Sequence, residues 1–512
     1  MVIMEPGGAS GQVQEGPATD RATLDRSLLD GIVWTGATRW AAQILSWAGT
    51  LVVARVLSPS QFGLVGATNV FIGLVERVSE LGLGAAVIRR RIRDPELVGQ
   101  INSTSVLLGI AFALVSFGAS WPLAAFLGKP EVREITGWMS LTFIITAFRV
   151  IPRAMLSLDL RFKRVAALDA AEAITSTVVI VALALGGAGV WSIVAGLLVG
   201  TVSSTILAVH AARPPFRWPT ATKQLGDEIR YGLHIVGTRL AWYWYNQADF
   251  MVVGRFLSAA AFGFYSFAWQ LASIPVQRIS ALVNQVSTPV FAQVYHQRAE
   301  LARYFLLLTE GLAFVTLPFS AGLVLTAPEL VVGVLSEKWA PTIVPLQILG
   351  LYGGMRTITN LFSNLLQTVG RAREVFVNTL IAAIVLPIGF VVGAITHGTT
   401  GVALVWVVGY PLVIIPQARL ALEVTGVPFL AYVRAMRPAA LATGIMAVAV
   451  FTVGEVRPAS WHPLAALAIE VFVGVAVYAG IVWGLYGDRA RKLVATFRGA
   501  QQTAKTTPEA AT

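Results

Sequence analysis

The sequence predicts an all-α protein that crosses a membrane many times, and three observations support this fold class. The chain has 512 residues, of which 56% are hydrophobic and 13% charged, and its mean hydropathy is +0.70. A soluble domain carries about 25% charged residues. Apolar runs of about 20 residues recur along the chain, each long enough to cross a hydrocarbon core of about 30 Å. These runs do not alternate apolar with polar residues, as the strands of a membrane β-barrel do.

About 14 membrane spans are expected from these apolar runs. Short links that contain Gly or Pro separate the spans, and residues 214–228 form one longer link in the middle of the chain. The predicted spans are 29–54, 62–87, 101–126, 135–157, 167–187, 189–211, 231–257, 261–288, 304–327, 342–368, 375–396, 398–418, 435–454 and 463–486.

An internal duplication organises the chain. Residues 31–63 and 231–263 align without a gap, and 11 of the 33 positions are identical. Both copies end in the pattern R-x-L-S-x-x-x-F-G, which chance similarity between two apolar segments would seldom reproduce. In the first copy the identical residues are Thr38, Arg39, Ala41, Ala48, Val52, Val53, Arg55, Leu57, Ser58, Phe62 and Gly63.

The duplication predicts two six-helix bundles of similar construction. Six spans separate the starts of the two copies, so both copies cross the membrane in the same direction, which defines a parallel repeat. The expected organisation is a disordered cytoplasmic tail (1–28), an N-terminal bundle (29–213), a cytoplasmic linker (214–228), a C-terminal bundle (229–424), two extra transmembrane helices (425–487) and a basic cytoplasmic tail (488–512).

The distribution of basic residues predicts the topology. With a cytoplasmic N-terminus, 24 of the 38 Lys and Arg residues fall in cytoplasmic tails and loops. Six fall in external loops: Arg55, Lys129, Arg133, Arg255, Lys338 and Arg457. Cytoplasmic loops of membrane proteins are enriched in these residues, so both termini are expected in the cytoplasm. The same bias explains the net charge of +11, and no nucleic-acid partner is expected.

Signatures of catalysis and of metal binding are missing from the sequence. The chain has no cysteine, and its five histidines show no metal-ligand spacing. It contains neither a Walker lysine motif nor G-x-S-x-G, and no loop is long enough for a catalytic domain. We therefore expect a protein that is not an enzyme and that has no cofactor and no metal site.

The other eight basic residues lie within predicted spans, and six of them form a candidate substrate-binding set. They sit roughly 12–18 Å from the cytoplasmic edge, at a rise of about 1.5 Å per residue, and come from equivalent spans of the two halves. Intramembrane charges usually face an interior cavity, and the planar fork of Arg suits phosphate. Snorkelling or pairing with a nearby acid is the alternative for each. The six are Arg39, Arg77, Arg149, Arg239, Arg278 and Arg356.

Two acidic residues within spans are candidates for ion coupling or for counter-ions. Asp249 lies in the outer half of the seventh span, beside Asn246 and Gln247, and Glu76 adjoins Arg77. Uptake of a proton or Na⁺ is one interpretation of Asp249. The role of counter-ion to a neighbouring Arg is the preferred one.

The spans, the two halves and the loop A-R-x-L-S-P-x-x-F-G at 54–63 resemble the polysaccharide-transporter branch of the multidrug/oligosaccharidyl-lipid/polysaccharide exporter superfamily. The segment 158–164 (LDLRFKR) is similar to that of lipopolysaccharide and exopolysaccharide exporters, and the resemblance covers residues from about 29 to 487. It implies a V-shaped pair of bundles, alternating access and a bacterial inner-membrane location. It also implies transfer of undecaprenyl-diphosphate-linked oligosaccharide to the periplasmic leaflet. Relatives that move lipid II carry arginines in spans comparable to those of Arg39, Arg77, Arg239 and Arg278.

The predicted function is therefore that of a flippase for lipid-linked oligosaccharide, embedded in membrane lipid, with a polysaccharide polymerase as a candidate partner. An ion-coupled drug or metabolite antiporter of the same superfamily is the alternative, but an exporter of cations would have an acidic cavity. A membrane scaffold without transport is a third class, but it does not explain why so many spans contain polar residues.

Overall fold

Every regular element in the described part of the chain is helical. The computed structural model describes residues 42–79, 83–220, 243–244, 246–458 and 460–506. The predicted tail 1–28 lies outside these residues. The helices are Ala42–Val56, α2 (Pro59–Ser79), α3 (Leu83–Arg89), α4 (Pro95–Leu127), α5 (Glu131–Met139), α6 (Leu141–Leu158), α7 (Phe162–Leu185), α8 (Val190–Ala212), residues 246–256, α10 (Ala259–Val294), α11 (Arg298–Leu325), α12 (Ala327–Leu330), the π-helix η1 (Val331–Leu335), the 3-10 helix η2 (Glu337–Thr342), α13 (Ile343–Thr368), α14 (Ala372–Thr425), α15 (Phe429–Val456) and α16 (Pro463–Thr506).

Length and composition make eight of the described helical segments candidate membrane spans. They are α4, the consecutive α5 and α6 taken together, α7, α8, α11, α14, α15 and the part Pro463–Gly487 of α16. A helical membrane protein with many spans is thereby confirmed, while the count of 14 stays a prediction. Helices α2, α10 and α13 are not in this set, since they carry more polar side chains.

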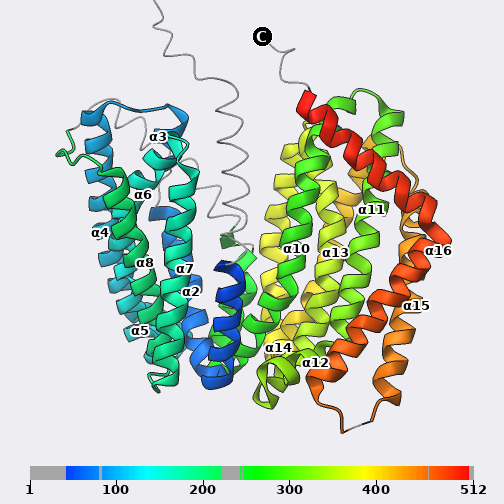
Figure 1. Ribbon diagram of the computed structural model, residues 1–512, viewed down its shortest axis with the longest axis horizontal. Helices are drawn as coiled ribbons and strands as arrows, with labels where there is room; N and C mark the ends of the chain where they lie inside the picture. Colours follow the sequence, from blue (N-terminus) through cyan, green and yellow to red (C-terminus); the bar gives the residue numbers. More distant parts are fainter. Residues whose placement is uncertain (1–41, 80–82, 221–242, 245, 459, 507–512) are drawn as a thin grey trace, which may run out of the picture.

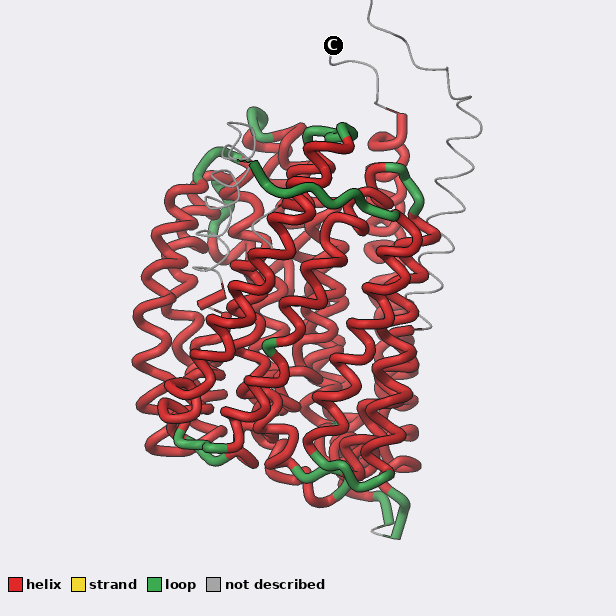
Figure 2. The backbone as a smooth tube through the Cα atoms, turned by 90° about the vertical axis from the view of Figure 1, so that its left-hand side faces the viewer, coloured by secondary structure: helices red, strands yellow, loops and turns green. Residues whose placement is uncertain are grey.

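The helices lie side by side in two groups. Figure 1 shows α3–α8 on one side and α10–α16 on the other, with loops gathered at the two ends of the molecule. The view turned by 90° in Figure 2 shows the same end-to-end run of the helices and the loops at both ends. Helix α2 packs against α10 across the two groups.

One predicted break between spans falls inside α14. His397 (φ −135°) and Gly398 (φ +58°) are non-helical there, so α14 consists of two helices that meet at a kink. The positive φ of Gly398 is a conformation that residues with a Cβ rarely adopt. The candidate span Pro463–Gly487 agrees with the predicted last span 463–486, and helix α16 continues beyond it to Thr506.

The duplicated motif starts a helix in each copy, which explains its serine. In the first copy, Ser58 Oγ accepts from the backbone N–H of Gln61 (3.3 Å), and Gln61 Oε1 accepts from the N–H of Ser58 (2.9 Å). In the second copy, Ser258 Oγ accepts from the N–H of Ala261 (3.1 Å). These contacts satisfy N–H groups that have no partner within the helix, so the two serines are the N-caps of α2 and α10.

The glycine of the motif allows the two copies to touch backbone to backbone. A Cβ atom on Gly63 would collide with the carbonyl oxygen of Ala259, and a Cβ on Gly263 would collide with that of Pro59. Because Gly63 aligns with Gly263 and Pro59 with Ala259, the same contact is made in both directions. Small residues permit this close approach of membrane helices. The first turns of α2 and α10 therefore form a pseudo-symmetric contact between the two halves.

Two lysines extend this contact by reaching across it in opposite directions. Lys129, which follows α4, donates to the carbonyls of Gly254 and Leu257 at the end of the second copy. Lys338, in η2, donates to the carbonyls of Arg55 (2.7 Å) and Leu57 (2.9 Å) at the end of the first. Burial, and secondarily the charge of Arg255, lowers the pKa of Lys129. Each half thus supplies a cation to the C-terminal carbonyls of a helix in the other half, where the helix has acceptors to spare.

The first copy has two further bonds to the second half. The guanidinium of Arg55 donates to the carbonyls of Gly333 (2.8 Å) and Val334 (3.0 Å), and the indole N–H of the buried Trp339 donates to the carbonyl of Ala54 (2.8 Å). The arginine of the first motif copy is therefore a structural residue. We call the contact formed by Gly63, Gly263, Lys129 and Lys338 the cross-brace.

Ion pairs attach the last two helices to the rest. Arg457, at the end of α15, contacts Glu329 in α12 and lies 3.1 Å from Glu470 in α16. Both glutamates are buried. Removing one partner of a buried ion pair leaves an uncompensated charge, so this cluster fixes α15 and α16 in place.

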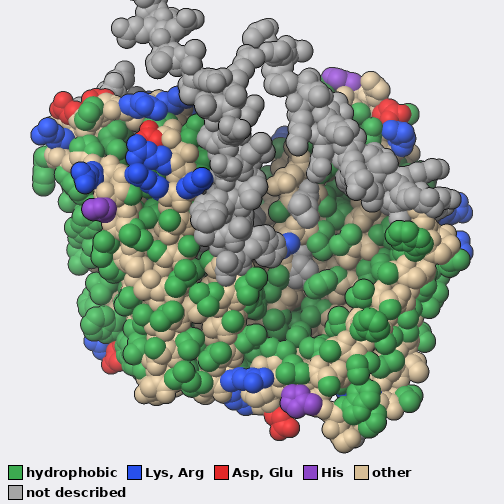
Figure 3. Space-filling view, viewed as in Figure 1, with side chains coloured by type: hydrophobic (Ala, Val, Ile, Leu, Met, Phe, Trp, Pro, Cys, Tyr) green, Lys and Arg blue, Asp and Glu red, His purple; other side chains and the backbone are tan. Residues whose placement is uncertain are grey.

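Apolar side chains cover the sides of the molecule, and charges gather at its ends. Figure 3 shows green side chains over the middle of the visible face, with Lys and Arg along the upper left edge and a smaller group at the bottom. On α14 the exposed side chains Phe376, Leu380, Ile384 and Ile388 lie four residues apart. That spacing puts them on one face of the helix, as expected for a surface in contact with lipid.

The cross-brace can be tested by the substitution Lys338→Met, which keeps the apolar stem and removes the ammonium group. We expect a loss of about 1–3 kcal/mol of stability, because two carbonyls lose a charged donor. The measurement is the thermal unfolding midpoint of the purified protein in detergent. Glu337→Gln is the matched control, since it removes a charge at the neighbouring exposed position. Equal midpoints for the two variants would contradict the cross-brace.

Candidate functional site

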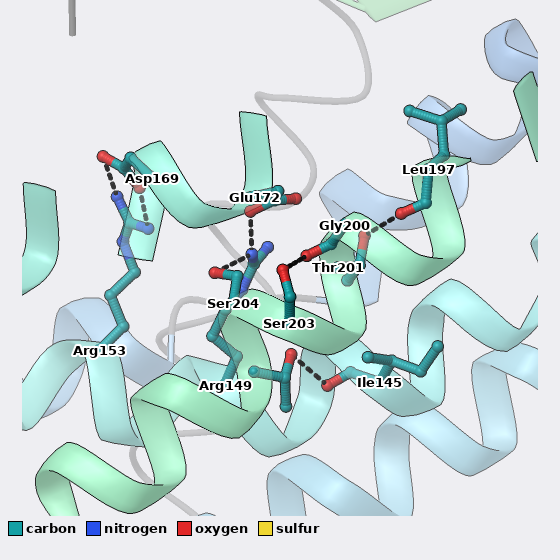
Figure 4. A network of polar contacts seen from close by, with 11 residues as sticks. Ile145, Arg149, Arg153, Asp169, Glu172, Leu197, Gly200, Thr201, Ser203 and Ser204 are labelled. Carbon is teal, nitrogen blue, oxygen red and sulfur yellow. Dashed lines mark hydrogen bonds and ion pairs between the residues drawn. The ribbon is translucent and has the colours of Figure 1, made fainter. Parts of the chain in front are cut away.

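The first half contains a polar network between three helices (Figure 4). Arg149 of α6 pairs with Glu172 of α7 and donates to Ser204 Oγ of α8 (2.9 Å). One turn along α6, Arg153 forms a bidentate pair with Asp169, with N–O distances of 2.6 and 3.2 Å. Both arginines therefore have acidic partners. Pairing with a nearby acid is the alternative to phosphate binding for each intramembrane arginine.

Glycines in α8 bring the network together. A Cβ on Gly196 would press on the carbonyl of Ser176, and one on Gly200 on the carbonyl of Glu172. Helices α7 and α8 therefore approach at backbone distance. That approach places Ser204 of α8 next to Arg149.

In the second half, a buried acid is held by neutral donors. Asp249 is fully buried, and its Oδ2 accepts from the hydroxyl of Tyr265 (2.7 Å) and from the indole N–H of Trp406 (3.0 Å). Its Oδ1 accepts from the N–H of Phe250 (2.9 Å). Buried carboxylates need such donors to offset the loss of water. Among the described residues no basic side chain pairs with Asp249, so its role as a counter-ion stays a prediction.

An arginine lies at the other end of the same aromatic cluster. Trp406 stacks on Tyr352, with 4.7 Å between ring centroids, and the hydroxyl of Tyr352 accepts from Arg356 (3.1 Å). Arg356 also donates to Asn246 Oδ1 (2.7 Å), one helical turn from Asp249. We call Asn246, Asp249, Tyr265, Tyr352, Arg356 and Trp406 the aromatic–charge cluster. It holds a buried acid and a half-buried guanidinium in one assembly.

The structure describes the side chains of only three of the six predicted arginines, Arg149, Arg278 and Arg356. Arg39 and Arg239 lie outside the described residues, and so does the side chain of Arg77, although its backbone belongs to α2. Arg278 is exposed on α10. Arg149 and Arg356 have their partners in different halves. A shared level for all six therefore stays a prediction, and so does ion coupling by Glu76, which is exposed at the end of α2.

Sequence reasoning missed the aromatic members of the cluster. Tyr265, Tyr352 and Trp406 belong to α10, α13 and α14, and Tyr265 lies in the aromatic-rich run 262–269. Nothing in their spacing distinguishes them from core residues. Only the polar atom that each aromatic carries gives a signal, because a buried hydroxyl or indole N–H needs a partner.

The fold resembles that of known membrane transporters. A solved structure described as the lipid II flippase MurJ in an inward closed conformation aligns with a TM-score of 0.72 over 90% of this chain and 100% of that chain, at 14% identity. An inward-facing multidrug resistance transporter of the MATE family aligns with a TM-score of 0.60 over 75% of this chain and 94% of its own, at 18% identity. At these identities the likeness defines the fold alone: a helical transporter fold shared by both proteins.

The family follows from sequence. Residues 52–344 match the model of a family described as polysaccharide biosynthesis protein, and the chain belongs to this family. The succinoglycan biosynthesis transport protein ExoT of Rhizobium meliloti is 26% identical over 76% of this chain and 78% of its own. The lipopolysaccharide biosynthesis protein WzxC of Escherichia coli is 22% identical over 75% and 78%. The predicted family, a family of transporters and not of enzymes, is confirmed.

A double substitution tests whether Arg149 is structural. Arg149→Gln should lower stability by about 3 kcal/mol, because Glu172 keeps a partly buried charge without its partner. Adding Glu172→Gln should restore most of the loss, since both charges are then gone. The measurements are unfolding midpoints of the three variants and the wild type. An unrestored double variant would mean that Arg149 acts through other contacts.

Proposed function

We propose that this protein is a flippase that moves polyprenyl-diphosphate-linked oligosaccharide from the cytoplasmic to the outer leaflet of the bacterial inner membrane, for surface polysaccharide synthesis. The observation that carries the proposal is membership of the polysaccharide biosynthesis family by a chain with the fold of a lipid II flippase. The named functions of the relatives, succinoglycan transport and lipopolysaccharide biosynthesis, point to the same class of cargo. A polysaccharide polymerase would take the product.

The diphosphate is the part of this cargo that needs cations within the membrane. We propose that Arg356, Arg278 and Arg77, together with Arg39 and Arg239, bind it. A guanidinium donates two parallel hydrogen bonds to a phosphate. Arg356 supports this proposal because neutral oxygens of Asn246 and Tyr352 orient it. Arg149 is the weakest member of the predicted set, since Glu172 already neutralises it.

Transport would proceed by alternating access of the two predicted bundles, 29–213 and 229–424. The cross-brace joins the halves at one end, and the predicted external residues Arg55, Lys129, Arg255 and Lys338 all belong to that end. We therefore assign the cross-brace to the outer side and the termini to the cytoplasm. In the state described, the halves are joined on the outer side and the cargo would enter from the cytoplasm.

Reconstitution in liposomes tests the proposed function. The probe is a short-chain polyprenyl-diphosphate oligosaccharide, and the readout is its transfer between leaflets. Arg356→Gln, and separately Arg39→Ala with Arg239→Ala, should slow transfer about tenfold or more, because each removes charged hydrogen bonds to phosphate. Arg303→Gln is the matched control, as Arg303 lies exposed on α11 beside Glu300.

The alternative function gives a different result in the same vesicles. An ion-coupled antiporter would leave the lipid probe in place and take up a cationic dye when a proton gradient is applied. Asp249, the buried acid of the aromatic–charge cluster, would then be the residue that couples ions. Dye uptake that Asp249→Asn abolishes, without transfer of the lipid probe, would overturn the flippase.

The absence of cysteine makes the orientation directly measurable. We expect a cysteine introduced at Ala372, at the start of α14, to react with an impermeant maleimide only in inverted vesicles. A cysteine introduced at His462, before α16, should react in intact cells. Both residues are exposed to solvent. The reverse labelling pattern would place the termini outside.

A further inference from the structure

One face of α10 has the composition of a wall of an aqueous cavity and not that of a lipid-facing surface. Every exposed side chain that the structure describes on α10 is polar, alanine or proline. The carboxamide and hydroxyl members of this face are Gln270, Gln277, Asn284, Gln285 and Thr288. By contrast, the exposed face of α14 is built from Phe, Val, Leu and Ile. Polar residues within a membrane protein face a cavity or the interior.

These residues form one stripe. Positions 277, 281, 284, 285, 288 and 292 are exposed and repeat at the three- and four-residue spacing of a helix face. From Gln277 to Ala292 the stripe is about 22 Å long at the rise of an α-helix. Figure 1 places α10 on the side of its group nearest the other group, and its first turns contact α2. The stripe thus belongs to the side from which the two halves face each other.

Helix α13 supplies a second row of carboxamides beside the stripe. The amide of Asn364 donates to Asn284 Oδ1 (3.0 Å) and to Ser287 Oγ (3.0 Å), while its Oδ1 accepts from Thr288 (3.1 Å). The amide of Asn360 donates to Ser280 Oγ (3.2 Å). These bonds fix the orientation of the row, so its remaining donors and acceptors are pre-organised. We call the α10 stripe with Asn360 and Asn364 the carboxamide track.

A cation stands at one end of the track. Gly353 of α13 contacts Val276, Asn360 contacts Ser280 and Asn364 contacts Asn284. The two helices therefore run in the same direction and in register. That register puts Arg356 level with the start of the track, near Gln277. Arg278 of α10 lies near the same end of the track. From there towards the C-terminal end of α10, the exposed polar groups of the track are amides and hydroxyls.

This order of groups matches the order of groups in a lipid-linked saccharide. A diphosphate needs cations. Neutral sugars carry hydroxyls that both donate and accept hydrogen bonds, and a carboxamide also offers both donors and an acceptor. We propose that the carboxamide track binds the neutral saccharide of the cargo while the diphosphate lies at Arg356. This inference rests on the proposed function and specifies which part of the cargo α10 recognises.

Equilibrium binding to the full-length protein in detergent tests the track. The two probes are cellobiosyl geranylgeranyl diphosphate and geranylgeranyl diphosphate without sugar. Wild type should bind the glycosylated probe about tenfold more tightly. Gln285→Leu should remove most of that difference and leave the affinity for the sugar-free probe unchanged, since one or two hydrogen bonds correspond to about tenfold.

The choice of variants keeps the fold intact. Gln285 is exposed and has no side-chain partner among the described residues, so its replacement breaks no internal bond. Gln285→Asn retains the carboxamide and should recover part of the preference. Gln297→Leu, the same substitution in the loop before α11, is the matched control and should behave as wild type.

The outcomes separate the two proposals. If Gln285→Leu lowered the affinity for both probes equally, or for neither, the proposed role of the carboxamide track would be wrong. The proposed flippase function would not be affected. Wild type that binds the sugar-free probe as well as the glycosylated one would also overturn the track. Wild type that binds neither probe would overturn the proposed function and this inference with it.

Discussion

The structure depends on the exchange of contacts between the two copies of the duplicated motif. Each copy contains the end of a helix, where the last carbonyls have no partner within the helix. Lys129 and Lys338 satisfy these carbonyls from the opposite half. Gly63 and Gly263 let the backbones come close enough for both lysines to reach. Each half thus completes the copy of the motif that belongs to the other half.

A joint of this kind concentrates rigidity at one end of the molecule. Phe62 of the first copy contacts Phe267 and Trp339 of the second half at ring-centroid distances of 6.1 and 5.5 Å. The apolar core that includes Ala54 and Phe262 therefore runs through both halves. Further along α10 the polar face replaces such packing. The two halves are thus joined by apolar packing at one end, while α10 presents polar groups further along its length.

Charges within the membrane are stabilised in two different ways, and the difference matters for function. Arg149 and Arg153 have carboxylate partners, so their charge is neutralised within the first half. Arg356 is oriented by an amide and a phenol, and Asp249 by a phenol and an indole. Neutral partners of this kind fix the direction of a charged group. That is the arrangement that a ligand of opposite charge can use.

The sequence by itself determined the class of protein, the family and the position of the duplicated motif at 55–63 and 255–263. Hydropathy and the Lys and Arg bias are properties of each segment, because they reflect whether it lies in lipid or in water. A duplicated motif can be recognised by aligning the sequence with itself. The break in α14 at His397 and Gly398 lies where the predicted spans 375–396 and 398–418 meet, whereas the predicted span 135–157 falls on two helices, α5 and α6. Which arginines pair with acids was left open as alternatives, because pairing is decided by helices far apart in sequence.

Tertiary structure alone decided three things: the partners of Arg149, the aromatic–charge cluster around Asp249, and the polar face of α10. Each depends on the rotation of a helix about its axis and on its neighbours. In a membrane, segments that are apolar overall gain little from any one rotation, so their sequences do not encode it strongly. The close approaches at Gly63, Gly196 and Gly200 set those rotations. Their effect appears only when both helices are in place.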